Sequence, residues 1–386
     1  MYSQKELAEF HRDKVHPPCS TCQQPEALMY TAFTGHKYIL KRMPHTWMYH
    51  SLECPLHSLS SSSGLNELID GGAIRENLET KEIELKLGFS LSKKIGQTKE
   101  RTTSEMSDTV KSEGISLTLC SLLEFVWEKA EFQELSSHIE RMLTWDDIKE
   151  QMLKSLENLR AHKSKLVERS YIPGSFQSID EKTDQMCRVT YSDGKSEKVG
   201  IVIGKLVDFH PPTSAKGSFK LDIKNNILQM NIDEKTYHKL SERYANQLSV
   251  WRNFDKTINI IVIATFVRKK RDDLSFNVLE FALMPTTKDW VPYANRLEKE
   301  LIEKLISDNR HFDKCFRYNL SADKPVPCVV LHDTDPPDVE MYVWPKEGLN
   351  VKQELSLEKI KKFSPITTWI WREEYEPDLP PLPPCC

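Results

Sequence analysis

The stretch TINIIVIATFVRK, residues 257–269, is a long run of β-branched and other apolar side chains. A run of this kind predicts a strand that is buried on both faces. A second apolar run, LSFNVLEFALMPTT at residues 274–287, follows after the charged turn KRDD. Because that turn is short, we expect two neighbouring strands that form the heart of the largest hydrophobic core.

The sequence around this pair alternates between strand and helix patterns, which predicts an α+β domain over residues 176–372. Further strands are expected at 198–209, 218–223, 227–232, 325–334 and 339–345. Amphipathic helices are expected at 233–251, 291–309 and 356–363. Residues 373–386 form a Pro-rich tail that is either disordered or docked on the domain.

A helical domain is expected over residues 114–175. Its first helix carries apolar residues at helical spacing: Leu119, Leu122, Leu123, Val126 and Trp127. The second helix opens with Thr144 as N-cap and Asp147 three residues later, a relative of the capping box. We expect it to continue into a basic end at residue 169. Residues 63–113 form a connector with one expected strand at 82–92.

The basic end of that second helix includes Arg160, Lys163 and Lys165. The simpler interpretation is compensation of the helix dipole, which favours cations near the C-terminus of a helix. The alternative is a winged-helix-like unit whose basic end contacts DNA phosphate. A second basic run is the turn Arg268, Lys269, Lys270 and Arg271.

The N-terminal segment HPPCSTCQQP, residues 16–25, places Cys19 and Cys22 in a Pro-flanked turn. A redox CxxC pair belongs at the start of a helix, so this pair fits a metal knuckle better. A hairpin pattern follows around Thr34 and Gly35, and then comes His50 with Cys54 four residues later. Knuckle, hairpin and a second ligand pair predict a zinc-ribbon-like module over residues 1–62.

Three thiolates and one imidazole would close a tetrahedral structural Zn²⁺ site, with Cys19, Cys22, Cys54 and His50 as the favoured ligands. His57 and His45 stay open as alternatives to His50. The other interpretation is that these cysteines are unrelated.

Composition limits the classes of function. The chain has 386 residues and a net charge of −4, so it has no global field that attracts polyanions. No run approaches the roughly 20 apolar residues of a membrane span, and the first residues lack a secretory apolar run. We expect a cytoplasmic protein without a membrane partner, whose cysteines are free thiols or metal ligands.

Several strings resemble one family across nearly the whole chain, among them YILKRMP, LLEFVWEKA, YIPGSF, LMPTTKDWVPY and VVLHDTDPPDVEMYV. The sequence resembles the bacterial domain-of-unknown-function family 1173, which occurs on plasmids and integrative conjugative elements. The resemblance implies a mobile-element protein, whose partners would include components of a conjugation system.

The C-terminal part has a weaker resemblance to restriction-endonuclease-like nucleases, which hold Mg²⁺ with carboxylates beside a phosphodiester. Here the catalytic positions are Cys328, Tyr342 and Trp344, none of which suits Mg²⁺. The acidic turn with Asp333, Asp335, Asp338 and Glu340 could be a relocated site, and Glu298 an accessory carboxylate. We expect a core of the nuclease type that does not cut, with the two long apolar strands beside it.

Three functions follow from these patterns. The favoured one is a non-catalytic, zinc-stabilised accessory protein that binds DNA or a protein of a transfer apparatus. One alternative is a divergent Mg²⁺-dependent nuclease. The other is an interaction protein with no nucleic-acid contact, whose DLPPLPP tail serves as a docking peptide.

Overall fold

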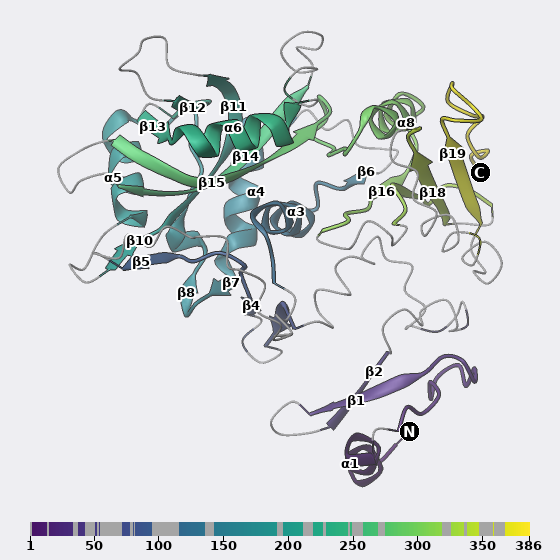
Figure 1. Cartoon of the computed structure of the whole chain (residues 1–386). Coiled ribbons are helices and arrows are strands. Elements are labelled where there is room, and N and C mark those ends of the chain that lie inside the picture. Colours follow the sequence, from purple (N-terminus) through teal and green to yellow (C-terminus); the bar gives the residue numbers. More distant parts are fainter. Residues whose placement is uncertain are drawn as a thin grey trace. The chain divides into compact units, whose positions relative to one another are not determined.

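The computed structural model divides into two compact units (Figure 1). Unit 1 comprises residues 1–70 and 308–386, and unit 2 comprises residues 71–307. The five-part division expected from the sequence stays a prediction. The structure describes residues 2–13, 15–33, 38–42, 51, 54, 72–77, 80, 82–94, 116–135, 143–190, 196–210, 219–226, 229–245, 248, 258–268, 275–318, 326–335, 338–346, 358 and 367–386.

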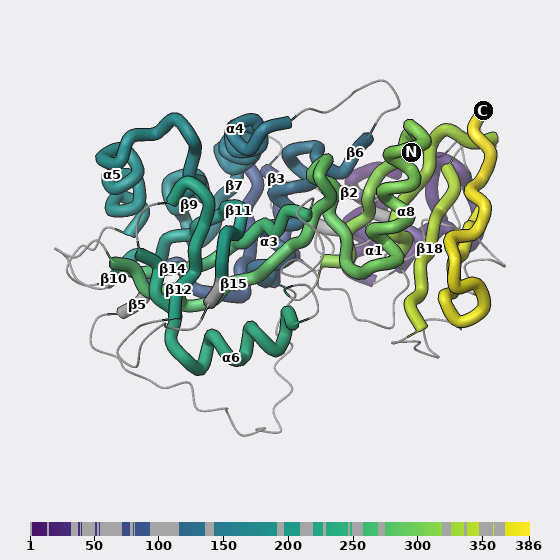
Figure 2. Tube along the Cα trace, turned by 90° about the horizontal axis from the view of Figure 1, so that it is seen from above, coloured from purple at the N-terminus to yellow at the C-terminus, as the bar shows by residue number. Residues whose placement is uncertain are grey.

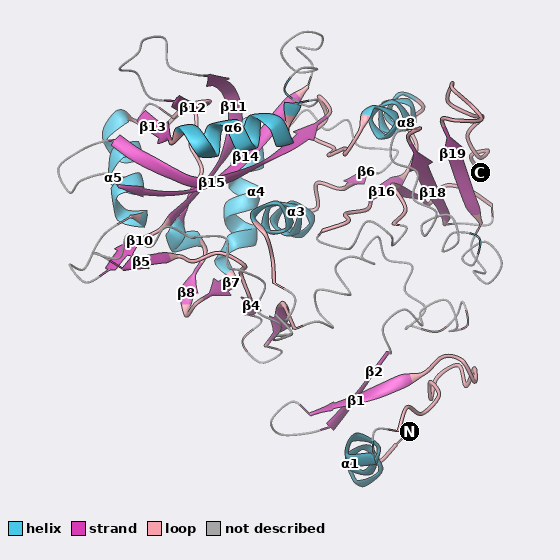
Figure 3. Ribbon diagram, viewed as in Figure 1, coloured by secondary structure: helices cyan, strands magenta, loops and turns pink. Residues whose placement is uncertain are grey.

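Unit 2 is built on a six-stranded sheet with the order β12-β13-β15-β14-β11-β9. Its long antiparallel strands β11 (Gly200–His210), β14 (Asn259–Arg268) and β15 (Ser275–Thr286) run side by side (Figure 3). The shorter members are β9 (Ser170–Tyr171), β12 (Phe219–Ile223) and β13 (Gln229–Ile232). The two strands expected at the heart of the core are therefore confirmed as neighbours.

Both faces of β14 are buried, as its unbroken apolar run predicts. The side chains of Ile260, Val262 and Phe266 join one large hydrophobic cluster with residues of α5 (Ile179–Val189) and α6 (Glu234–Arg243). Helix α6 contributes Tyr237 and Leu240 and lies along β15 in both views (Figures 1 and 2). Helix α3 (Leu119–Lys129) also packs against β14 and β15.

The local signals for the helices of unit 2 are mostly confirmed. Helix α3 buries Leu122, Val126 and Trp127, as its spacing predicts. Helix α4 (Trp145–Glu157) has a complete capping box, in which Thr144 and Asp147 each bind the other's backbone N–H. Helix α8 (Arg296–Ser307) buries Leu297, Leu301, Ile302 and Leu305 on one side.

The expectation that the second helix runs to residue 169 is wrong. Helix α4 ends at Glu157, and residues 159–165 form a β-hairpin of β7 (Leu159–Ala161) and β8 (Ser164–Lys165). The turn residues His162 and Lys163 both have positive φ, the geometry of a tight hairpin turn. Neither is Gly or Asn, so the sequence carries no turn signal there. A short 3-10 turn, Val167–Arg169, follows.

The hairpin extends a small second sheet of order β3-β4-β7-β8, with β3 (Ile74–Glu76) and β4 (Ile83–Leu85). Strand β4 begins the expected 82–92 strand, and the alternate residues Ile83, Leu85 and Leu87 are buried. Unit 2 also contains the strand pair β5 (Ser92–Lys94) and β10 (Ser196–Lys198), and the two-residue strand β6 (Glu134–Leu135).

The C-terminal part of unit 1 holds strands β16 (Phe312–Lys314), β17 (Val329–Leu331), β18 (Val339–Trp344) and β19 (Thr368–Arg372). Neighbours pair antiparallel except β18 and β19, which are parallel. We expected β14 and β15 beside β17 and β18, but the structure places the two pairs in different sheets and different units. A strand pattern shows that a strand forms but not which sheet it joins.

The N-terminal part of unit 1 holds helix α1 (Gln4–Asp13) and the antiparallel hairpin of β1 (Met29–Phe33) and β2 (Tyr38–Arg42). The Gln4 side chain exchanges two hydrogen bonds with the backbone of Tyr38, each of 2.9 Å. The predicted hairpin is confirmed. Among the described residues, no helix has the length and apolar character needed to cross a membrane.

Candidate metal centre

The predicted CxxC knuckle lies in a turn that is hydrogen-bonded to the chain at the start of the β1–β2 hairpin. The N–H of Cys19 donates to the carbonyl of Ala27 at 2.8 Å, and the N–H of Met29 donates to that of Pro17 at 2.8 Å. The turn closes through the N–H of Gln23, which donates to the Cys19 carbonyl at 2.9 Å. Gln23 has a φ of 52°, so the chain reverses sharply after the second cysteine. No helix follows, in contrast to a redox CxxC.

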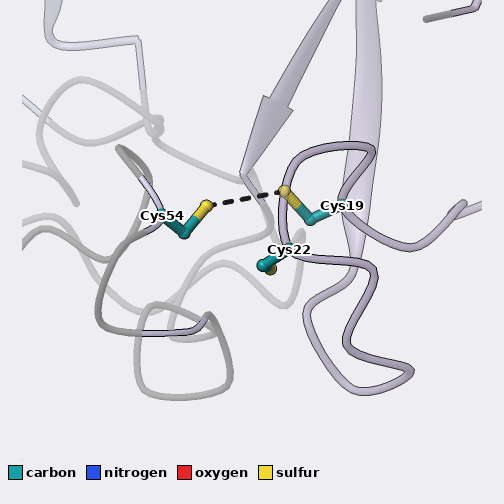
Figure 4. Close-up of side chains that lie close together, drawn as sticks. All are labelled: Cys19, Cys22 and Cys54. Carbon is teal, nitrogen blue, oxygen red and sulfur yellow. Dashed lines mark hydrogen bonds between the residues drawn. The ribbon is translucent and has the colours of Figure 1, made fainter.

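Cys54 joins the pair from a separate turn, in which its N–H donates to the carbonyl of Ser51 at 2.9 Å. The sulfur atoms of Cys19, Cys22 and Cys54 all lie within 4.8 Å of one another. In Figure 4 the side chains of Cys19 and Cys54 point toward one another, with Cys22 beside them. Cys19 and Cys54 are buried, and Cys22 is half-buried.

The sulfur–sulfur distance distinguishes a disulfide bond from a metal site. Cys19 Sγ and Cys54 Sγ are 3.8 Å apart, far beyond the roughly 2.05 Å of a disulfide bond. Ligands at about 2.3 Å from a tetrahedral zinc ion are separated by about 3.8 Å along each edge of the tetrahedron. The Cys19–Cys54 separation thus equals one edge of such a tetrahedron, and the Cys22 sulfur lies within 4.8 Å of both. Within the described part of the chain, no other group of three or more ligating side chains comes together in this way.

The environment of Cys22 favours its thiolate form. Burial alone would raise the pKa of the Cys22 thiol, but hydrogen bonds from the backbone of Gln24 and Ser51 and from the other two cysteines lower it overall. The thiolate is the form that binds metal. Three close sulfurs, one of them with a lowered thiol pKa, could hold a metal ion.

The fourth ligand expected from the sequence is not placed. His50 and its alternatives His45 and His57 lie outside the described residues. The hydrophobic residues Ala27 and Met29 pack with Cys19 and Cys54 into one small buried cluster. Within the described part of the N-terminal module, the candidate metal ligands thus also take part in apolar packing.

The predicted nucleic-acid-binding residues are only partly placed. Lys163 and Lys165 are exposed on the β7–β8 hairpin. Arg160 is half-buried, and its Nη1 donates to both carboxylate oxygens of Glu82, at 2.8 and 3.0 Å, so it is engaged within the chain. Arg268 is at the end of β14, while Lys269, Lys270 and Arg271 lie outside the described residues.

The acidic turn of the C-terminal sheet does not gather its carboxylates around one point. Asp333 accepts two hydrogen bonds from Arg310, each of 2.9 Å. Asp338 Oδ1 lies 2.6 Å from Nδ1 of His332, and Glu340 accepts a 2.9 Å hydrogen bond from the Tyr342 hydroxyl. Among the described residues, no three of these groups come close enough to hold a metal ion together.

Two partners in this turn could not be foreseen from the sequence. Arg310 binds Asp333 from 23 positions away, and Asp313 lies 3.3 Å from Nε2 of His332. The two carboxylates beside His332 raise the pKa of its imidazole to about 9, with the Asp313 contact as the main cause. No motif in the sequence links these positions.

The comparisons with known proteins address the family. A family model described as a protein of unknown function (DUF1173) matches residues 3–374. No curated protein matches the chain. No solved structure matches it either, and the nuclease-like core stays a prediction. Because the matched segment spans nearly the whole sequence, the resemblance is confirmed: the chain belongs to the DUF1173 family.

Proposed function

We propose that Cys19, Cys22 and Cys54 hold a structural Zn²⁺ ion, and that the protein is a zinc-stabilised, non-catalytic accessory protein of a bacterial mobile element. The observation that carries the metal proposal is the 3.8 Å separation of two buried sulfurs on different turns. Thiolate ligands favour zinc over harder ions such as Mg²⁺. His50 supplies the fourth ligand, with His57 or His45 in its place as the alternatives.

The metal would fold the module that holds it. The described core around the trio consists of Ala27 and Met29, with Leu40 packed against it. So small a core supplies little hydrophobic stabilisation, and modules of this size usually depend on a metal or disulfides. Zinc binding would therefore contribute directly to the folding free energy of this module.

The accessory role is binding, and DNA is the partner we favour. The exposed lysines at the tip of the β7–β8 hairpin, Lys163 and Lys165, support this choice together with the basic turn at 268–271. A hairpin that follows two packed helices is also a feature of winged-helix units. Contacts through lysine and arginine would be made to phosphate and would tolerate any base sequence.

Metal analysis of protein purified without a chelating step tests the proposal. We expect one equivalent of zinc per chain in the wild type and in a Cys187→Ser control, whose half-buried thiol lies outside the trio. The double variant Cys19→Ser/Cys22→Ser should contain almost none. Less than about half an equivalent in the wild type, or metal retained in the double variant, would reject the site.

Cobalt substitution tests the fourth ligand. Tetrahedral Co²⁺ absorbs in the visible range, and the spectrum depends on the number of sulfur and nitrogen ligands. His50→Ala should change the spectrum of the cobalt protein, whereas His45→Ala and His57→Ala should leave it unchanged. A change in one of the other two variants alone would assign that histidine in place of His50.

A further inference from the structure

The segment Glu376–Cys386 carries two copies of the tripeptide Leu-Pro-Pro, at 379–381 and at 382–384. It lies beside β19 (Figure 1). Proline fixes φ near −65° and lacks a backbone N–H, so repeats of this kind favour the left-handed polyproline II helix. The segment follows β19 through a turn in which the N–H groups of Tyr375 and Glu376 donate to the Arg372 carbonyl.

Exposed residues recur along the repeats with the three-residue period of a polyproline II helix. Asp378, Pro381 and Pro384 are exposed, and they are three residues apart. The pairs between them, 379–380 and 382–383, are half-buried. A polyproline II helix has three residues per turn, so every third residue faces the same way. Each repeat therefore turns its Leu-Pro pair toward the protein and its second proline toward solvent.

Side chains of unit 1 bind the carbonyl groups of this segment. The Trp369 indole N–H donates to the Pro381 carbonyl at 3.0 Å, and Nη1 of Arg310 donates to the Pro383 carbonyl at 2.8 Å. The Trp371 indole N–H donates to the Glu376 carbonyl at 2.8 Å. A polyproline II helix makes no internal hydrogen bonds, which leaves these carbonyls available to such donors.

The groups that bind the segment are held by other parts of the same sheet. The Arg310 side chain is 6% exposed and is fixed by its bidentate pair with Asp333. Trp371 is fully buried on the edge strand β19. The backbone N–H of Cys386 also donates to the Asp333 carbonyl at 2.9 Å. Arg310 is thus positioned by its pair with Asp333, and Trp371 by its place on β19.

We propose that Arg310, Trp369 and Trp371 form a docking surface for polyproline II segments, and that a partner protein with a Leu-Pro-Pro repeat binds there in exchange for residues 376–386. The hydrogen bonds go to backbone carbonyls, and the Leu-Pro pairs are half-buried. A partner segment with the same repeat presents the same carbonyls and the same Leu-Pro pairs. The protein's own segment acts as an intramolecular competitor. At an effective concentration in the millimolar range it would weaken binding of an external segment by about tenfold or more.

The test uses the full chain and a fluorescent peptide of sequence EPDLPPLPP, followed by anisotropy. We compare the wild type with a variant in which Pro380, Pro381, Pro383 and Pro384 are changed to Ser. That variant should bind the peptide at least about tenfold more tightly than the wild type. Adding Trp369→Phe, which keeps an aromatic ring but removes the indole N–H, should reverse the gain. The control peptide EPDLSSLSS should bind neither protein.

A second measurement distinguishes loss of docking from loss of folding. The indole N–H resonance of Trp369, assigned by its absence in Trp369→Phe, should move in the four-proline variant and return when the peptide is added. The resonances of the buried Trp127 and Trp145 in unit 2 should stay in place. Equal peptide affinity in wild type and variant, or a Trp369 resonance that the peptide does not restore, would show that the contact serves only within the chain and would overturn the proposal.

Discussion

The sulfur atoms of Cys19 and Cys54 lie 3.8 Å apart although the two residues are 35 positions apart in the chain. The β1–β2 hairpin between them brings the CxxC turn and the turn at Cys54 to the same place. The sulfurs that could hold a metal ion thus lie in or against the same small apolar cluster.

Removing the metal should therefore unfold this module and leave unit 2 intact. We expect a chelator to increase amide hydrogen exchange throughout residues 15–42, because a structural ion contributes folding free energy to its own module. Exchange in β14 and β15 should not change. Cys54→Ser should reproduce the chelator effect, whereas Cys187→Ser should not. Unchanged exchange at residues 15–42 after complete metal removal would contradict a structural role.

Charge reversal tests the proposed DNA contacts. Changing Arg268, Lys269, Lys270 and Arg271 to Glu, or Lys163 and Lys165 to Glu, should weaken binding to any duplex sequence. It should also reduce the salt dependence, by about one unit of slope for each lost phosphate contact.

The matched control is Lys235→Glu/Lys239→Glu, which reverses two exposed lysines of α6. It should change binding much less than either test variant. If all three variants bind as tightly as the wild type, neither basic run makes the contacts. If the wild type fails to bind at low salt, the chain is an interaction protein without nucleic-acid contact. Fluorescence anisotropy over a range of salt concentrations makes the measurement.

The buried Glu340 should make the C-terminal sheet less stable as the pH rises. Burial raises the pKa of Glu340 to about 7 from its ordinary 4.5, although the Tyr342 hydroxyl donates to it and lowers the value somewhat. Between these two pH values the folded state holds a proton that the unfolded state has lost. The contribution of Glu340 to stability is then highest below about pH 4.5 and falls by about 3 kcal/mol by pH 7.

Glu340→Gln, which cannot ionise, should flatten this dependence. Urea unfolding at pH 5 and at pH 7.5, followed by tryptophan fluorescence, checks the prediction. The control Glu374→Gln changes an exposed carboxylate and should keep the wild-type dependence. An identical pH dependence in Glu340→Gln and the wild type would show that Glu340 ionises normally.

The N-cap of α4 should contribute measurably to its stability. Thr144→Ala removes the hydroxyl that accepts from the N–H of Asp147, which costs about 1 kcal/mol. Amides of the first turn should exchange about fivefold faster as a result. Thr144→Ser keeps the hydroxyl and should exchange like the wild type. Equal rates in the Ala and Ser variants would mean that packing alone holds this turn.

That cap also shows how far local sequence signals reach. The Thr144–Asp147 box, the spacing of Leu122, Val126 and Trp127, and the strand pattern at 259–268 each depend on neighbours within a few residues, and each is confirmed. The prediction at His162 and Lys163 was wrong, because a hairpin turn forms there in place of a helix. Its positive φ values come from the pairing of β7 with β4 and β8 and not from typical turn residues. Tertiary pairing can override a local pattern.

The candidate site also has features that follow from local sequence and features that depend on tertiary pairing. The order of CxxC turn, hairpin and Cys54 predicted that the three cysteines come together, as they do. Arg310 with Asp333, and His332 between Asp313 and Asp338, meet only because strands β16, β17 and β18 are neighbours. Sheet order of this kind has no signature in the sequence of any one strand.

Unit 1 consists of two separate stretches of the chain, which the ribosome makes at different times. A ribosome makes residues 71–307 before it makes 308–386, so unit 2 is complete while the second stretch of unit 1 does not yet exist. The three thiols, by contrast, all lie within the first 54 residues. All three cysteines of the proposed zinc site therefore leave the ribosome before any residue of unit 2.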